Sequence, residues 1–314
     1  MSNPYRVIAS KLFKSPHLSQ IMYQKYLIIA SKKDPAGINI TTQLNQFRQN
    51  PVISSMSNAP GFDFYLREEE IISDKNLNHE KINKYDFVIF ASKHQSEKKI
   101  KSLSIHAPGN WKGAEIGGRA TLRENQGNPV TSEVGSREKT ICKTSAVFQK
   151  QLFGFLSKNA KEHNLKDYQI TLECTHHGPL IEKPCIFIEI GSTENEWTDR
   201  KAGFIVAKTI RDIIENFKEN QYNEIAFGIG GPHYCPNFNK IQLNSNIAIS
   251  HIIPQYVLPI TEEMIKQALE KTEEEIDFAL LDWKGITNAE ERQRVIEILD
   301  KLYIRYKKTG QIEK

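Results

Sequence analysis

Apolar runs of strand length alternate along this chain with longer stretches in which apolar residues recur at helical spacing. The strand-like runs are residues 86–92, 103–106, 170–174, 186–190, 224–229 and 246–253. Helical spacing marks residues 145–163 and 196–219, and residues 261–308 are predicted to be charged, amphipathic helix. Because helices and sheets bury one another's apolar faces, this alternation predicts an α/β sandwich around a mainly parallel sheet.

The chain of 314 residues can bury a sizeable core, and we predict one α/β domain over residues 1–314. Residues 1–83 form a possible N-terminal βαβ subdomain, with strands at Tyr5–Ala9 and Tyr26–Ala30. Residues 107–144 are rich in glycine and in basic residues. A loop of this length is uncommon in a compact domain unless it is functional or disordered. We interpret it as a segment that embraces the substrate, with plain disorder as the alternative.

The stretch Thr171–Ser192 places imidazoles where a strand ends. Two apolar runs flank a turn that carries His176 and His177, and the short connection favours an antiparallel pair over a parallel crossover. Glu173 and Glu189 would then share a face below the two histidines. Carboxylates beside imidazoles suit a metal site or a general base. The alternative is that the glutamates mark a solvated face and the histidines a polar turn.

Histidine stands at or near the end of a predicted strand in five separate segments. These histidines are His94, His106, the pair His176 and His177, His233, and His251. Each alone is more typical of a structural role, but together they favour a catalytic zinc site. Such a site keeps one position open for water, and the zinc lowers the pKa of that water to about 7. No GxSxG serine competes for the role of nucleophile.

The net charge and the spacing of motifs bear on other classes of protein and of binding site. The net charge of +4, from 42 Lys+Arg and 38 Asp+Glu, permits an anionic partner without requiring one. The four cysteines show no CxxC spacing, which argues against a zinc ribbon. In GIGGPHYCP, residues 228–236, proline follows the paired glycines, which disfavours a dinucleotide site and instead suits close approach of a substrate. No apolar run approaches the roughly 20 residues that cross a bilayer, and no signal-peptide pattern opens the chain, so we expect a cytoplasmic protein.

Six segments, in order along the chain, resemble one protein family. They are SKHQS at 92–96, IHAPGNW at 105–111, THHGP at 175–179, FIEIGSTENEW at 187–197, GIGGPHYCP at 228–236 and HIIPQY at 251–256. On these segments the chain is similar to the zinc-type D-aminoacyl-tRNA deacylases of archaea and plants. The resemblance implies a three-layer α/β/α sandwich around a mixed sheet, like that of peptidyl-tRNA hydrolases and nucleoside phosphorylases. It also implies a monomer that uses zinc to hydrolyse the ester between a D-amino acid and the terminal ribose of tRNA.

Within this resemblance we assign roles as hypotheses. The candidate zinc ligands are His94, His176, His177 and His233, with His106, His251 and Cys235 as further candidates. Glu173 or Glu189 would act as general base or support a ligand. The backbone of Gly230 and Gly231 would stabilise the oxyanion. The candidate substrate contacts are Asn110, Lys112, Arg119 and Arg123, the basic ones for phosphates of the CCA end.

Two other classes of function stay open on the sequence. A zinc-dependent exopeptidase or amidohydrolase would use similar ligands on small substrates, although the basic glycine-rich loop favours a large anionic one. A tRNA-binding or metal-carrying module without turnover is the other alternative. Binding alone does not require ionisable groups concentrated at strand ends, so the pattern favours an enzyme.

Overall fold

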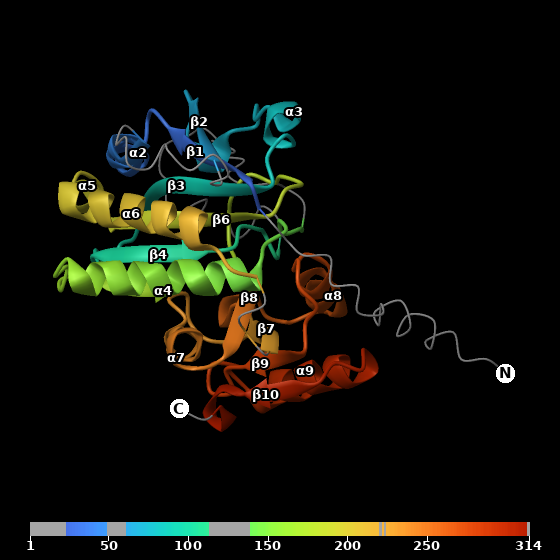
Figure 1. The fold of residues 1–314 in the computed structure, drawn as a ribbon. Coiled ribbons are helices and arrows are strands. Elements are labelled where there is room, and N and C mark those ends of the chain that lie inside the picture. The colour runs from blue at the N-terminus through green and yellow to red at the C-terminus, as the bar shows by residue number, and fades with distance from the viewer. Residues whose placement is uncertain (1–22, 49–60, 113–138, 220–221, 223, 313–314) are drawn as a thin grey trace, which may run out of the picture.

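The computed structural model describes residues 23–48, 61–112, 139–219, 222 and 224–312. Their strands form two separate sheets, of six and four strands (Figure 1). Helices cover both sheets, so the predicted α/β class with mainly parallel strands is confirmed. The predicted strand Tyr5–Ala9 lies outside the described residues. The division of the chain into domains stays a prediction.

The six-stranded sheet has the order β2-β1-β3-β6-β4-β5. Its strands are β1 (Lys25–Ser31), β2 (Gly61–Arg67), β3 (Phe87–Gln95), β4 (Ser102–His106), β5 (Gln169–Leu172) and β6 (Cys185–Ser192). The first four in spatial order run parallel, whereas β4 is antiparallel to β6 and parallel to β5. The prediction that β5 and β6 form an adjacent antiparallel pair is wrong. They do run in opposite directions, but β4 lies between them and takes the ladder hydrogen bonds of both.

Three long helices cover one face of this sheet: α2 (Pro35–Arg48), α4 (Ala146–Glu162) and α6 (Arg200–Asn216). Ser145 caps α4 by accepting a hydrogen bond from the amide of Phe148, as its position before the apolar stripe predicts. The ring of Phe148 then stacks on that of Phe87 in β3, with centroids 4.0 Å apart. The short helix α5 (Glu194–Trp197) follows β6 and precedes α6.

The opposite face of the six-stranded sheet has lighter cover. The short elements η1 (Ile71–Ser73) and α3 (His79–Ile82) contribute Ile71 and Ile82 to its apolar cluster. Loop residue Ile181 completes this cover beside Phe187 of β6. This face therefore leaves room for polar side chains where β3, β6 and β4 lie next to one another.

The four-stranded sheet has the order β10-β9-β7-β8, and all of its strands are parallel. Its strands are β7 (Glu224–Ile229), β8 (Ile247–Ile253), β9 (Phe278–Leu281) and β10 (Tyr306–Lys308). One face packs on α4 and α7 (Pro236–Asn244), and the other on α8 (Glu262–Glu270) and α9 (Ala289–Lys301). The short turns η3 (Gln255–Val257) and η4 (Thr309–Gln311) follow β8 and β10. Helix α4 lies between the two sheets (Figure 1).

The predicted helical character of residues 261–308 is wrong in part, because this stretch also contains β9 and β10. Each strand is too short for its apolar residues to outweigh the amphipathic pattern of α8 and α9 around it. The predicted helix over residues 196–219 is divided between α5 and α6, with a break at Thr198 and Asp199. The other predicted strands and helices within the described residues are confirmed with small shifts of their ends. Among the described residues, no helix is long and apolar enough to cross a membrane.

Candidate metal centre

Polar side chains line one face of the six-stranded sheet, opposite α2, α4 and α6. Ser92 and His94 alternate on β3, and Ser104 and His106 alternate on β4. The register sets both serines beside Glu189 of β6. Because alternate residues of a strand share a face, all five side chains point to the same side of the sheet. All five are buried.

Two loops bring further ionisable groups over this face. The loop after β5 carries Glu173, whose amide donates to the carbonyl oxygen of Ile105 at 2.9 Å. The loop after β7 carries His233, whose carbonyl oxygen accepts from the amide of Cys174 at 3.0 Å. The centre is thus built at the junction of the two sheets, with ligand candidates from both.

The turn after β5 is held in an unusual conformation. His177 has a φ of 28° and Gly178 a φ of 121°, and a Cβ at Gly178 would lie 2.6 Å from the Cβ of Pro108. Only glycine combines this backbone conformation with that close approach. The amide of Gly109 donates to the carbonyl oxygen of His177 at 2.6 Å and fixes the turn against the segment after β4.

Glu173 lies at the centre of the first group of contacts. Its Oε1 is 3.2 Å from Nδ1 of His94, and its Oε2 is 3.2 Å from Nε2 of His233 and 3.4 Å from Nε2 of His176. The atoms of His94, Glu173 and His233 lie close enough to hold one metal ion, and so do those of Cys174, His176 and His233.

Glu189 lies at the centre of the second group. Its Oε2 is 3.7 Å from Nδ1 of His94 and 3.7 Å from Nε2 of His106, and its Oε1 is 4.0 Å from Nε2 of His177. The hydroxyl of Ser92 donates to Oε1 at 2.6 Å and so orients the carboxylate. His106, His176 and His177 also form a possible ligand set.

Two of the imidazoles present a lone pair to a carboxylate. Nδ1 of His176 donates to the carbonyl oxygen of Cys174 at 2.8 Å, and Nδ1 of His106 donates to that of Ala107 at 3.2 Å. In these tautomers each Nε2 is an acceptor, and each faces a carboxylate oxygen, which is also an acceptor. Nε2 of His106, both oxygens of Glu173 and Oε2 of Glu189 are buried without a hydrogen-bond partner. Buried acceptors that face one another need a cation between them, so the residues fit a bound metal.

Charge and burial divide the imidazoles into two kinds. Burial alone would lower the pKa of His94, but Glu173 and Glu189 raise it to about 10. Burial likewise opposes the effect of Cys174 and Glu173 on His233, whose pKa is raised to about 11. Burial and the neighbouring His106 lower the pKa of His177 to about 3.

The pKa of His176 is held well below its usual value, first by burial and then by the neighbouring imidazoles. Burial opposes ionisation of both carboxyls, but the pKa of Glu173 is lowered by His94 and His233, and that of Glu189 by His106 and His94. Both glutamates are therefore carboxylates at neutral pH, which is the form that binds metal.

Tyrosines and one tryptophan hold the imidazoles in place. The hydroxyl of Tyr234 lies 2.9 Å from Nε2 of His94, and Nε1 of Trp197 donates to the carbonyl oxygen of His94 at 2.9 Å. The hydroxyl of Tyr256 lies 2.7 Å from Sγ of Cys174. Tyr256 is 43% exposed, so it reaches from the surface to Cys174.

The chain matches a described family along most of its length. The family whose sequence profile is described as D-aminoacyl-tRNA deacylase matches residues 81–123 and 124–307. The chain belongs to the D-aminoacyl-tRNA deacylase family. This confirms, at the level of the family, the resemblance seen in the six sequence segments.

Individual relatives agree with this family. The D-aminoacyl-tRNA deacylase of Pyrococcus furiosus is 36% identical over 295 residues, which cover 89% of this chain and 98% of that protein. The D-aminoacyl-tRNA deacylase of Thermococcus onnurineus is 32% identical with the same coverage. The crystal structure of a conserved protein of unknown function superposes with a TM-score of 0.73 at 26% identity, and covers 92% of this chain and 96% of that one. The likeness to peptidyl-tRNA hydrolases stays a prediction.

The structure brings together most of the residues that the sequence singled out in this deacylase-family chain. The members of the cluster are His94, His106, His176, His177 and His233, with Glu173 and Glu189. His251 is not among them. Its Nδ1 lies 3.2 Å from the hydroxyl of Thr175 and its Nε2 lies 3.3 Å from the carbonyl oxygen of Lys271, so hydrogen bonds occupy both nitrogens.

Of the cysteines Cys174 and Cys235, only Cys174 belongs to a possible ligand set of the described residues. Cys235 caps α7 and directs its thiol to the carbonyl oxygen of His233 at 3.3 Å, outside the possible ligand sets of the described residues. Cys174, which sequence reasoning placed on an apolar strand face, belongs to one of these sets because β5 ends at Leu172. Its position two residues before His176 was the available signal.

The expected oxyanion role does not fit the paired glycines. The amide of Gly230 donates to the carbonyl oxygen of Ile253 at 2.8 Å, and that of Gly231 to the carbonyl oxygen of Gly285 at 3.3 Å. Both donors are therefore committed to the backbone. The glycines instead allow the positive φ values, 95° and 83°, by which the chain turns from β7 toward His233.

The candidate substrate contacts are only partly within the described residues. Arg119 and Arg123 lie outside them. Asn110 is buried, and its side-chain oxygen accepts from the amide of Lys112 at 3.3 Å. The ammonium of Lys112 donates to the carbonyl oxygen of Leu258 at 2.7 Å. Contacts of these residues with phosphate stay predictions.

Proposed function

We propose that this protein hydrolyses the ester between a D-amino acid and the 3′-terminal ribose of tRNA, with zinc as its cofactor. Membership of the D-aminoacyl-tRNA deacylase family supports the substrate and the reaction. The observation that carries the metal is the pairing of buried acceptors, in which Nε2 of His176 faces a carboxylate oxygen of Glu173. Imidazole, carboxylate and thiolate together are the donor set that zinc prefers.

His94, Glu173 and His233 would hold the ion, with Cys174 and His176 beside them. When bound, zinc supplies a Lewis acid and lowers the pKa of a coordinated water. Tyr234 positions His94 through the hydrogen bond to its Nε2, and the carbonyl oxygen of Cys174 fixes the tautomer of His176.

We assign Glu189 the role of general base. The hydroxyl of Ser92 holds one carboxylate oxygen, whereas Oε2 has no hydrogen-bond partner and is directed at the cluster. His106 and His94 keep the carboxyl ionised, so Oε2 has a free lone pair at neutral pH and accepts the proton of the attacking water. Aminoacyl-tRNA is used in the cytoplasm, where we propose that the protein acts. The monomeric state implied by the resemblance stays a prediction.

The test is deacylation of matched D- and L-tyrosyl-tRNA by metal-stripped protein, with and without added zinc. We expect zinc to restore cleavage of the D-ester and to leave the L-ester intact. His176→Ala and His233→Ala should each lower the restored rate and the zinc content. His79→Ala, in the exposed part of α3, is the matched control and should change neither.

No cleavage of the D-ester by zinc-loaded protein would overturn the proposed reaction. Hydrolysis of small peptides or amides in its place would support the exopeptidase or amidohydrolase alternative. Full activity of both histidine variants with undiminished zinc would refute the ligand assignment and leave the reaction standing.

A further inference from the structure

A pocket outside the metal centre lies at the carboxyl ends of β9 and β10. Its volume is about 790 Å³, and it lies between α7, the turn after β9 and η4. The residues that matter here are Lys240, Asp282, Trp283, Lys284, Lys308 and Ile312. The carboxyl ends of parallel strands are where α/β proteins bind ligands. The volume lies in the range of small-molecule sites and exceeds what one nucleotide needs.

The pocket carries positive charge that the protein itself does not neutralise. Within the described part of the chain, Lys240, Lys284 and Lys308 form no ion pair with a carboxylate. The ammonium of Lys308 instead lies 3.7 Å from the ring centroid of Trp283, which holds it at the pocket wall. Three cations without acidic partners around one hollow indicate an anionic ligand.

One carboxylate, that of Asp282, also lines the pocket. Asp282 is buried, and its two oxygens accept from the side-chain amide of Asn237 at 3.1 and 3.0 Å. The amide of Gly285 adds a third hydrogen bond at 3.3 Å. Asp282 therefore stays a structural acceptor beneath the pocket, and the lysines outnumber it three to one.

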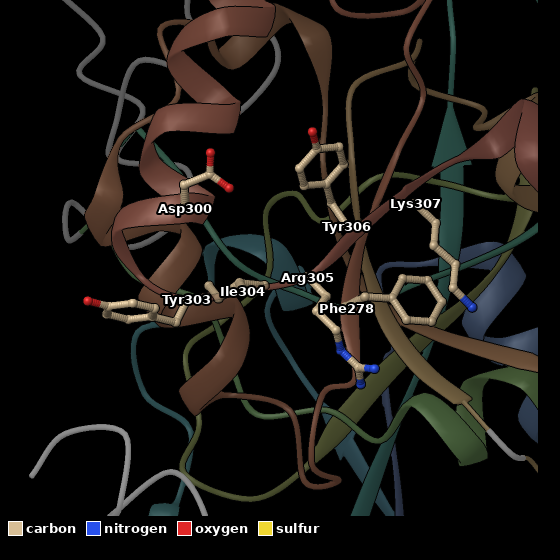
Figure 2. Close-up of a pocket in the computed structure, with 7 residues that line it drawn as sticks. All are labelled: Phe278, Asp300, Tyr303, Ile304, Arg305, Tyr306 and Lys307. Carbon is tan, nitrogen blue, oxygen red and sulfur yellow. The ribbon is translucent and has the colours of Figure 1, made fainter. Parts of the chain in front are cut away.

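A neighbouring pocket shows the contrast. Figure 2 shows this other pocket, whose lining includes Tyr303, Arg305 and Lys307. Its cations are paired, because Arg305 lies 3.8 Å from Asp277 and Lys307 contacts Glu224. The pocket lined by Lys240, Lys284 and Lys308, here called the lysine pocket, thus differs from the one in Figure 2 because its positive charges are available to a ligand.

The lysine pocket borders the loop that supplies His233 to the metal centre. A Cβ at Gly231, two residues before His233, would lie 2.8 Å from Oδ2 of Asp282. Asn237, which donates to Asp282, is four residues after His233. Asp282, in the lining of the pocket, is thus in contact with the chain on both sides of His233.

We propose that this pocket binds a phosphate and base of the single-stranded acceptor end of tRNA. Lys240, Lys284 and Lys308 would contact the phosphate, and Trp283 with Ile312 would supply an apolar wall for the base. This inference rests on the proposed function, since it assumes that the ester lies at the metal centre. It differs from the predicted contacts of Lys112, because Lys112 follows β4, whereas the three lysines lie in α7, after β9 and at the end of β10.

The test compares the triple variant Lys240→Gln, Lys284→Gln, Lys308→Gln with the zinc-loaded wild type on two substrates. One is D-tyrosyl-tRNA, and the other is D-tyrosyl-adenosine, which has the same ester but no phosphate. We expect the ratio of KM for the tRNA to KM for the adenosine ester to rise about tenfold. Each phosphate contact on a single strand contributes about 0.7 to the slope of log affinity against log salt, and the pocket would bind one phosphate, so the magnitude of the slope should fall by about 0.7.

The matched control is Arg305→Gln, which removes one exposed cation from the pocket in Figure 2 and should change neither quantity.

A second measurement is calorimetric titration with the 5′-phosphorylated trinucleotide CCA, which does not depend on hydrolysis. Binding to wild type and loss of it in the triple variant would support the pocket even if no ester is cleaved. In that case the proposed function falls and the pocket stands.

Normal cleavage of D-tyrosyl-tRNA by the triple variant, with an unchanged KM ratio and salt slope, would overturn the pocket and leave the function standing. Inorganic phosphate that binds as tightly as the trinucleotide would show a simple anion site and would also contradict RNA binding. Failure of both cleavage and trinucleotide binding by the wild type would remove both proposals.

Discussion

Glu173→Gln isolates the charge at the middle of the cluster, because glutamine keeps the shape of the side chain and removes its negative charge. The carboxylate lies 3.2 Å from a nitrogen of His94 and 3.2 Å from a nitrogen of His233. At an effective dielectric constant of about 20, each contact is worth about 5 kcal/mol of attraction before desolvation. Breaking a buried pair of this kind costs about 3 to 5 kcal/mol net. We expect about 3 kcal/mol in the zinc-free protein, because the imidazoles can release their protons once the carboxylate is gone.

Zinc should then stabilise the variant much less than the wild type. A ligand at 100 times its Kd adds about 2.7 kcal/mol to the free energy of unfolding. If the substitution weakens zinc binding about 100-fold, the same zinc concentration equals the Kd of the variant and adds only about 0.4 kcal/mol. The expected signature is a zinc-dependent increment that falls from about 2.7 to about 0.4 kcal/mol.

The assay is unfolding in guanidinium chloride at pH 7.5, with chelator and with a fixed excess of zinc. Glu274→Gln is the matched control, since this buried glutamate accepts hydrogen bonds from Ser145 and the first amides of α4. We expect it to lower stability and to keep the full zinc increment. An undiminished zinc increment in Glu173→Gln would refute the assignment of Glu173 to the metal.

Three further predictions follow from the geometry. Burial lowers the pKa of His251 to about 4, so below about pH 6.5 its imidazole binds more protons in the unfolded chain than in the folded one. His251 should therefore contribute about 2 kcal/mol to the loss of unfolding free energy between pH 7.5 and pH 5, and the loss should be smaller by about that amount in His251→Gln when both proteins are unfolded in chelator. Gly178→Ala forces a Cβ to within 2.6 Å of Pro108, so we expect a loss of stability of about 2 kcal/mol and a lower kcat, which thermal unfolding and deacylation measure together. Tyr234→Phe removes the hydrogen bond to His94, and we expect zinc affinity in a competition titration to fall about 10-fold with little change in zinc-free stability; equal affinity would contradict a positioning role.

The apolar runs predicted the architecture because β3, β6 and β8 are long enough to show a clear strand pattern. The sequence did not reveal two sheets, since pairing depends on contacts between strands far apart in the chain. It also missed β9, Phe278–Leu281, whose four residues lie between two amphipathic helices. Four apolar residues fit a helix turn as well as a strand, so only packing against β7 decides the outcome.

The candidate site was predicted from histidines near the ends of strands. This signal does not separate His94, which belongs to the cluster, from His251, which does not. Both histidines lie on buried strands, but His94 points to the polar face of its sheet, whereas the nitrogens of His251 bond to Thr175 and to a backbone carbonyl. A strand that is buried on both faces gives no alternation to show which face a residue takes. Cys174 was missed for a related reason, because the predicted strand continues two residues beyond the end of β5 at Leu172.

The mixed direction of the strands explains how one carboxylate can meet imidazoles from two sides. On β6, Glu189 has Ser92 directly opposite on β3 and Ser104 directly opposite on β4. His94 lies two residues after Ser92, and His106 two residues after Ser104. Because β3 and β4 run in opposite directions, these two histidines extend to opposite sides of Glu189 along the strand. Had β4 been parallel to β6, both would lie on the same side, and the loop with Glu173 could not close over the space between them. The reversal of β4 and β5 is therefore what converts a row of strand-end histidines into an enclosed centre.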